Sequence, residues 1–388
     1  MPLGPHFLCQ SNLNHAALLL VFTAIPVHSA SAQAAIPCDY YGAHGQGAKY
    51  CINMPPPGGW NGGLVVFAHG YVPVTAPVDI QWDQMYLADG TYIPALLNSM
   101  GYAFATTSYS VNGLAVVQAD HDILDLMEVF KENVGKPRRS YLVGVSEGGL
   151  ITTLMIEKHP EEFNGGMAMC GPIGNFNKQI NYWGNFRVAF DHYFPTVLPP
   201  SAVKIPQALI DNWDTAVLPG IGFALSTADP ATIGTLLAVT GAPIDLTDPA
   251  GSTPKTILGL LWYNVFSTNN GNEVLRGQPF DNHDYQYLDP ALNFFAPRYT
   301  ADKKALKTIA ENYQTSGRLK TPLVTLHTTG DPIVLFEQST LYSQKVLANK
   351  KGAAYLNIPV ERYGHCNFTI DEVLGGFSWL ISQPAGKK

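Results

Sequence analysis

Residues 141–152 read YLVGVSEGGLIT, and this stretch decides the fold. An apolar run leads into Gly144, Ser146 and Gly148, and a helix-like segment follows at once. A serine hydroxyl is an effective nucleophile only when a base takes its proton and its oxygen stands clear of the backbone. A sharp turn from strand to helix exposes the oxygen, favours glycine at the crowded flanking positions and supplies free N–H groups. Because G-x-S-x-G also occurs in ordinary glycine-rich turns, the prediction of a nucleophile at Ser146 depends on this strand and this helix.

The composition describes a globular chain. Of its 388 residues 46% are hydrophobic and only 14% are charged, so the chain can bury a large core. The formal net charge is −7, and the sequence has no run of Lys or Arg. Nucleic acid and anionic membrane surfaces are therefore excluded as expected partners.

The N-terminus predicts export. An apolar run at residues 16–27 is followed by small-residue sites at 30–32 (ASA) and 32–34 (AQA). The run is too short to span a bilayer comfortably, so we expect residues 1–34 to be a cleaved signal peptide. A buried N-terminal helix is the alternative. No later segment reaches transmembrane length, so we expect no membrane span and a secreted or periplasmic protein.

The cysteines agree with export. Cys9 would leave with the signal peptide, and an even set would remain: Cys38, Cys51, Cys170 and Cys366. Cys38 and Cys51 are close in sequence, so we expect them to form a disulfide. By elimination Cys170 would pair with Cys366, and the alternative is two free buried thiols.

From residue 63 onward, short β-rich apolar runs alternate with segments of helical period. We expect strands at residues 63–68, 103–109, 140–145, 166–170, 323–327 and 354–360. We expect helices at residues 93–100, 119–133, 147–158, 301–316, 337–349 and 370–382. This alternation predicts an α/β fold with a mostly parallel central sheet flanked by helices.

The alternation stops between Cys170 and about Pro297. This segment is rich in aromatic residues and is broken by prolines. A structureless loop of this length is improbable in a compact protein, so we expect a mostly helical insertion.

The order of motifs resembles that of the α/β-hydrolase superfamily, in which an oxyanion loop, a serine, an acid and a histidine follow one another along the chain. His69-Gly70-Tyr71 directly follows the strand at 63–68, which is the place of the oxyanion loop. The resemblance implies that the backbone N–H groups of Tyr71 and Glu147 form the oxyanion hole. We interpret His69 as a packing residue. The resemblance also implies a mainly helical cap after the sixth strand, at residues 172–300, between core segments 35–171 and 301–388.

The acid and the histidine follow two later strands. Asp331 lies in TGDPIV just past the strand at 323–327, and the carboxyl end of a parallel strand faces the cleft. Glu337 is the alternative acid. His365 follows the last strand, and we interpret the other histidines near these segments as structural: His121, His159 and His327. Ser146, Asp331 and His365 would form a triad in which the histidine acts as base and then as acid.

One finer resemblance is partial. Tannases and feruloyl esterases carry a cysteine just before the serine and another just after the histidine, joined by a disulfide. Cys366 matches the second position, but Val145 occupies the first. Cys170, at the end of the neighbouring strand, would substitute as the partner and clamp the histidine loop to the sheet.

The resemblance extends from about residue 63 to residue 380. It implies a secreted serine esterase, or a lipase-like enzyme, that hydrolyses carboxylic esters through an acyl-enzyme on Ser146 without a metal or an organic cofactor. Aromatic side chains of the insertion would line an apolar pocket for a small-molecule or polymeric ester. A serine peptidase of the same fold and a non-catalytic binding protein are the alternatives. The glycosylation sequon at Asn367 adjoins His365, so we expect it to be unmodified.

Overall fold

The structure is a computed structural model that describes residues 38–349 and 353–384, so the predicted signal peptide at 1–34 lies outside the described residues. The described chain contains an eight-stranded sheet in the order β1-β2-β4-β3-β5-β6-β7-β8. β1 pairs with β2 and β2 pairs with β4 in antiparallel fashion, and the pairings from β4 to β8 are parallel. The prediction of a mostly parallel sheet is confirmed. The strands are β1 (Tyr40–His44), β2 (Ala48–Asn53), β3 (Gly63–Ala68), β4 (Ala103–Thr107), β5 (Arg139–Val145), β6 (Gly165–Met169), β7 (Leu323–Gly330) and β8 (Tyr355–Tyr363).

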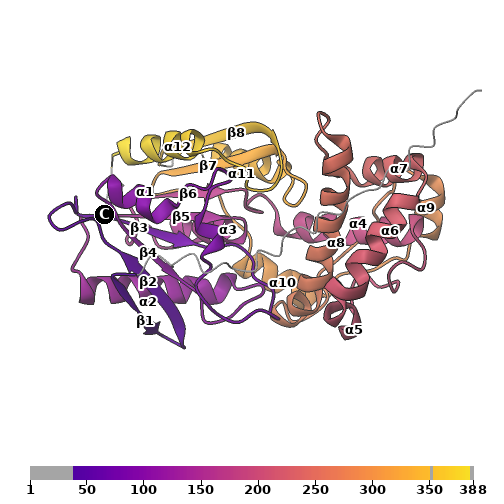
Figure 1. Ribbon diagram of the computed structural model, residues 1–388, viewed down its shortest axis with the longest axis horizontal. Helices are drawn as coiled ribbons and strands as arrows, with labels where there is room; N and C mark the ends of the chain where they lie inside the picture. The colour runs from indigo at the N-terminus through magenta and orange to yellow at the C-terminus, as the bar shows by residue number, and fades with distance from the viewer. Residues whose placement is uncertain (1–37, 350–352, 385–388) are drawn as a thin grey trace, which may run out of the picture. The chain divides into compact units, whose positions relative to one another are not determined.

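Helices cover both faces of the sheet. In β3, Leu64 and Val66 belong to the hydrophobic cluster of one face, and Val65 and Phe67 belong to that of the other. A strand buried on both faces is a continuous apolar run, as GLVVFA is. Figure 1 shows α2 and α12 on opposite sides of the sheet. One face packs against α2 (Val116–Asn133), α3 (Glu147–Lys158), α10 (Lys303–Asn312) and α11 (Glu337–Ala348), and the other against α1 (Ile93–Ser99) and α12 (Ile370–Ser382).

The segment between β6 and β7 is helical and builds a hydrophobic cluster of its own. Figure 1 shows these helices gathered beside the sheet. Apart from α10, which packs on the sheet, they are α4 (Phe176–Tyr193), α5 (Gln207–Asp211), α6 (Leu218–Thr227), α7 (Pro230–Thr240), α8 (Pro249–Val274) and α9 (Pro290–Phe295), with a short π-helical turn at Trp213–Val217.

Three helices of this segment begin in the same way. Asp229, Asp248 and Asp289 each precede a proline, and each side chain accepts a hydrogen bond from a backbone N–H of the first helical turn. An aspartate at the N-cap satisfies a free donor, and proline at the next position loses no helical hydrogen bond. The Asp-Pro pairs therefore fix where α7, α8 and α9 start.

The sequence interpretation missed the two antiparallel strands. β1 and β2 lie in the segment before residue 63, for which no strand was expected. Most of β1 is exposed, and Gly42 lies at its centre, so it lacks the apolar pattern of the parallel strands. β7 and β8 also continue past the expected ends at residues 327 and 360. Among the described residues, no single helix is long and apolar enough to cross a membrane, although the bent pair Trp213–Thr227 and Pro230–Thr240 meets the length and composition criteria together.

Candidate active site

Ser146 occupies the turn between β5 and α3. Its φ is 55° and its ψ is −120°, a conformation that side-chain-bearing residues rarely adopt. Its backbone N–H donates to the carbonyl of Met169 over 2.9 Å. A Cβ atom on Gly144 would lie 2.1 Å from the carbonyl oxygen of Gly148, and one on Gly148 would lie 2.0 Å from that of Ala68. Only glycine fits at 144 and 148, so these contacts explain the motif physically.

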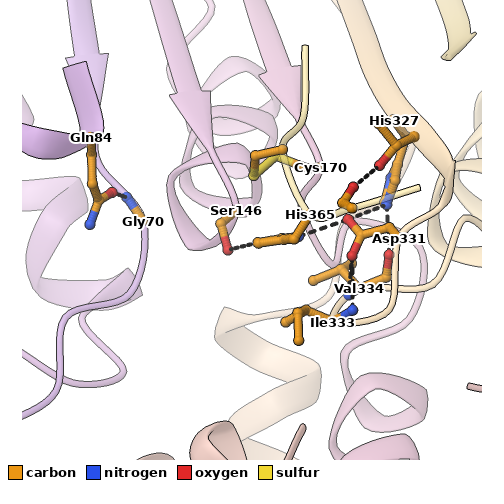
Figure 2. The surroundings of a disulfide bond; sticks show 12 residues. Gly70, Gln84, Ser146, Cys170, His327, Asp331, Ile333, Val334 and His365 are labelled. Carbon is orange, nitrogen blue, oxygen red and sulfur yellow. Dashed lines mark hydrogen bonds and ion pairs between the residues drawn. A yellow bond between two sulfur atoms is a disulfide. The ribbon is translucent and has the colours of Figure 1, made fainter. Parts of the chain in front are cut away.

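The structure brings together the serine, acid and histidine that the sequence singled out. His365 Nε2 lies 2.8 Å from Ser146 Oγ, and His365 Nδ1 lies 2.7 Å from Asp331 Oδ2 (Figure 2). In the tautomer that satisfies both bonds, Nδ1–H donates to the carboxylate and Nε2 accepts from the hydroxyl. The three side chains come from the carboxyl-terminal ends of β5, β7 and β8, which lie at one edge of the parallel sheet.

Asp331 is fully buried, and its two oxygens have separate partners. Oδ1 accepts from the N–H groups of Ile333 and Val334 at 2.9 and 3.0 Å, which leaves Oδ2 for His365 (Figure 2). Burial alone would raise the pKa of Asp331, but the imidazoles of His365 and His327 outweigh burial and hold the pKa at about 2. The carboxylate therefore stays ionised.

His327 lies next to this aspartate. Its Nε2 is 2.7 Å from the carbonyl oxygen of Val334 and 3.4 Å from Asp331 Oδ2 (Figure 2). The sequence placed His327 inside a strand and gave no sign of this contact, because the chain must turn back after β7 to create it. The alternative acid, Glu337, instead forms an ion pair with Lys178 at the surface.

The loop after β3 lies against the serine. A Cβ on Gly70 would be 3.1 Å from Ser146 Cβ, and the Gly70 N–H donates to Gln84 Oε1 over 2.6 Å (Figure 2). Within the described chain, the backbone N–H groups of Tyr71 and Glu147 donate to no protein acceptor. The two donors expected for an oxyanion are thus available. Nothing in the sequence indicated that Gln84 would hold this loop.

The surroundings of His69 are those of a packing residue. Its ring stacks on Tyr109 with a centroid separation of 3.9 Å, and Nδ1 lies 2.7 Å from the carbonyl oxygen of Gly70. Burial lowers the pKa of His69 to about 4, so the ring is neutral. His69 therefore packs against the loop that follows β3.

Two disulfides join the same cysteines as the sequence suggested. Cys38 bonds to Cys51, and Cys170 bonds to Cys366 with a Cα–Cα distance of 5.3 Å. Cys170 follows β6 and Cys366 follows His365, so the second disulfide ties the histidine loop to the centre of the sheet. Because both sulfur atoms are used in the bond, neither offers a thiolate to a metal.

The inserted helices hold the acid turn. From α4, Gln179 and Trp183 donate to the carbonyl oxygen of Ile333, and Tyr182 donates to that of Pro332, over 2.8 to 2.9 Å. Ile333 and Val334 themselves pack in the hydrophobic cluster of the insertion. The turn that carries Asp331 is therefore shaped by the insertion as well as by β7.

Helix α8 is fixed over the serine from two sides. The hydroxyl of Tyr71 donates to the carbonyl oxygen of Phe266 over 2.8 Å, and the hydroxyl of Tyr363 lies 2.8 Å from Thr256 Oγ1. Between these anchors, Tyr263 stacks on Trp183, and its hydroxyl is within hydrogen-bonding reach of Ser146. Burial raises the pKa of Tyr263, so it remains a donor. Nothing in the sequence distinguished Tyr263 from the other aromatic residues of the insertion.

Two cavities open beside Ser146. The inner cavity, of about 90 Å³, lies between the sheet and the helices α4 and α8. The outer cavity, of about 220 Å³, lies against the loop after β3 and the histidine loop. Ser146 lines both cavities, so a molecule bound across the serine can extend in two directions.

The strand order, the serine turn after β5, the acid after β7 and the histidine after β8 define the α/β-hydrolase fold with a serine-hydrolase-type arrangement. No model of a known protein family matches the chain, and no curated protein matches it.

Several solved structures are similar to this chain. An acylaminoacyl peptidase bound to a chloromethyl ketone aligns over 90% of this chain and 41% of its own, at 13% identity and a TM-score of 0.47. This chain therefore spans about two fifths of that peptidase. Feruloyl esterase B from Aspergillus oryzae aligns over 84% of this chain and 72% of its own, at 16% identity and a TM-score of 0.43. An esterase from the same organism aligns over 88% and 78%, at 15% identity and a TM-score of 0.46. The fold rests on the strand order and the serine turn, and these similarities add nothing about activity.

Proposed function

We propose that this protein is a serine hydrolase that cleaves carboxylic esters. The observation that carries the proposal is the continuous hydrogen-bonded chain from Ser146 through His365 to the buried carboxylate of Asp331. Nucleophilic catalysis requires a hydroxyl that is hydrogen-bonded to a base, and a third group that orients this base, at the edge of a cavity.

In the proposed reaction, Ser146 Oγ attacks the ester carbonyl while His365 Nε2 takes the hydroxyl proton. The N–H groups of Tyr71 and Glu147 donate to the oxyanion of the tetrahedral intermediate. His365 then gives the proton to the alcohol oxygen, the alcohol leaves, and the acyl group remains on Ser146. Water, deprotonated by His365, attacks this acyl-enzyme and releases the carboxylic acid.

The cavity walls favour a neutral substrate. Among the described lining residues of the two cavities, the acidic one is Glu147, and none is Lys or Arg. Glu147 Oε1 already accepts from the Ala115 N–H over 2.8 Å, and burial keeps this carboxyl protonated at neutral pH. A peptidase that captures a free amine would need an ionised carboxylate there, so an ester is favoured over an amine-terminal peptide.

A substrate panel tests the proposal. We expect p-nitrophenyl esters to be hydrolysed with a kcat/KM at least about a hundredfold above that of aminoacyl or prolyl p-nitroanilides, because no described residue lining the two cavities offers an ionised carboxylate to an amine. A fluorophosphonate probe should label Ser146. Preferential cleavage of the anilides would establish the peptidase instead, and a failure to label Ser146 would support a non-catalytic binding protein.

The pH dependence gives a second test. Burial raises the pKa of Glu147 to about 8, so its carboxyl is neutral below pH 8 and negative above it. A negative charge in the wall of the cavity that contains Ser146 opposes a transition state that is itself an oxyanion, so kcat/KM should fall as the pH rises through about 8. Glu147→Gln is neutral at every pH and should abolish this decline. Identical profiles from pH 6 to 10 for the two proteins would refute the role of this carboxyl.

We also propose that residues 172–300 act as the cap of the site, between core segments 35–171 and 301–388. The hydrogen bonds of α4 to the acid turn and of Tyr71 to α8 support a cap that is part of the site. The two disulfides are compatible with an oxidising compartment and support the proposal of a secreted or periplasmic protein.

A further inference from the structure

The two cavities at Ser146 differ in their relation to the histidine. Ser146, Tyr71 and Tyr263 line both cavities, whereas His365 lines the outer one and is not among the residues that line the inner one. Ser146 therefore lies where the two cavities meet, and His365, the proposed general acid, lies on the side of the outer cavity.

The chemistry of ester cleavage decides which part of the substrate each cavity binds. The alcohol oxygen must lie close to His365 Nε2, because it receives its proton from that atom as the bond to the acyl carbon breaks. The acyl carbon is bonded to Ser146 Oγ, so its other substituent extends away from the imidazole. We infer that the inner cavity binds the acyl group of the substrate and the outer cavity binds its alcohol group. This assignment rests on the proposed esterase function.

The walls of the two cavities describe the substrate that fits. The wall of the inner cavity is mostly apolar, and the aromatic side chains in it are Tyr71, Phe176, Trp183, Tyr263 and Phe280. The outer cavity, at about 220 Å³, mixes apolar side chains such as Leu87 and Phe368 with the polar groups of Gln84 and His365. The substrate class is thus an ester of an apolar acid with an alcohol that carries polar groups.

Gly271 offers a clean way to fill the inner cavity. It lies on α8 and lines this cavity, and a Cβ added there would meet no atom within 4 Å. Residues with side chains are also better helix formers than glycine, so a substitution there should not unfold α8. Gly220 is the matched control, because it is a helical glycine with equally open space that lines neither cavity.

The test compares two substrate series on Gly271→Leu and wild type. In the first series the acyl group of p-nitrophenyl esters grows from acetyl to octanoyl, and in the second the alcohol of butyrate esters grows from methyl to naphthyl. We expect Gly271→Leu to lower kcat/KM for the long acyl groups about tenfold relative to acetate and to leave the ranking of alcohols unchanged. Leu87→Phe, in the outer cavity, should do the reverse, and Gly220→Leu should change neither ranking.

The outcomes separate this inference from the proposed function. A wild-type protein without esterase activity would refute the function itself. An active wild type in which Gly271→Leu changes the ranking of alcohols, or changes neither ranking, would overturn the assignment of the cavities alone. Gly271→Ala, with thermal melting of each variant, gives a smaller change of the same sign if the larger side chain disturbs folding.

Discussion

Ser146→Ala is expected to lower the turnover number for p-nitrophenyl butyrate at least about a thousandfold. The substitution removes the oxygen that would form the proposed acyl-enzyme, and it should leave the hydrogen bond between His365 and Asp331 in place. Alanine tolerates the φ of 55° at this turn no worse than serine does, so the fold should persist. Steady-state kinetics measure the loss, and intact-mass analysis after fluorophosphonate treatment should show no adduct.

Ser226→Ala is the control for this experiment. Ser226 is an exposed residue of α6 whose hydroxyl donates to the carbonyl oxygen of Phe223, so its loss should leave turnover within about twofold of wild type. If Ser146→Ala retained most of the activity while melting like the wild type, another residue would have to be the nucleophile.

Asp331→Asn is expected to lower turnover about ten-thousandfold with little change in KM. The carboxylate accepts a hydrogen bond from His365 Nδ1–H, and in the proposed mechanism it stabilises the imidazolium that forms when Ser146 loses its proton. A neutral amide cannot stabilise this charge, and its NH₂ group can favour the tautomer in which Nε2 carries the proton. His365 could then no longer act as the base toward Ser146. The kinetics should be followed between pH 6 and pH 9.

Glu337→Gln is the matched control, because Glu337 was the other candidate for the acid. Its carboxylate forms an ion pair with Lys178 at the surface, where such pairs contribute little. We expect turnover and melting temperature to be nearly unchanged. A large loss in Glu337→Gln together with an active Asp331→Asn would reverse the assignment of the acid.

Local chemistry explains why so much of the site could be predicted. A Cβ atom on Gly144 would lie 2.1 Å from the carbonyl oxygen of Gly148 in the same turn, whereas one on Gly148 would meet the carbonyl oxygen of Ala68 in β3. Both glycines lie two residues from Ser146, so the motif can be recognised in the sequence. Parallel strands bring their carboxyl ends to one edge of the sheet, which is why a residue just past β7 and another just past β8 were recognisable as partners.

Signals were weak where burial was incomplete. β1 was missed because it is largely exposed, and the ends of β7 and β8 were misplaced because these strands run on into the turns that carry Asp331 and His365. Some contacts form only because the chain turns back on itself, such as the contact between His327 and Asp331. No pattern in the sequence indicates them.

The sequence by itself determined the turn at Ser146 and the α/β alternation, because these follow from local sterics and from the period of apolar residues. The order of the three candidate catalytic residues was implied by the resemblance to the α/β-hydrolase superfamily. Only the tertiary structure decided that α8 lies over the serine, that Tyr263 reaches it and that two cavities meet there. These features depend on contacts such as that of Tyr71 with Phe266, which are 195 residues apart in the chain. Such contacts leave no periodic pattern, because side-chain packing between distant segments selects them.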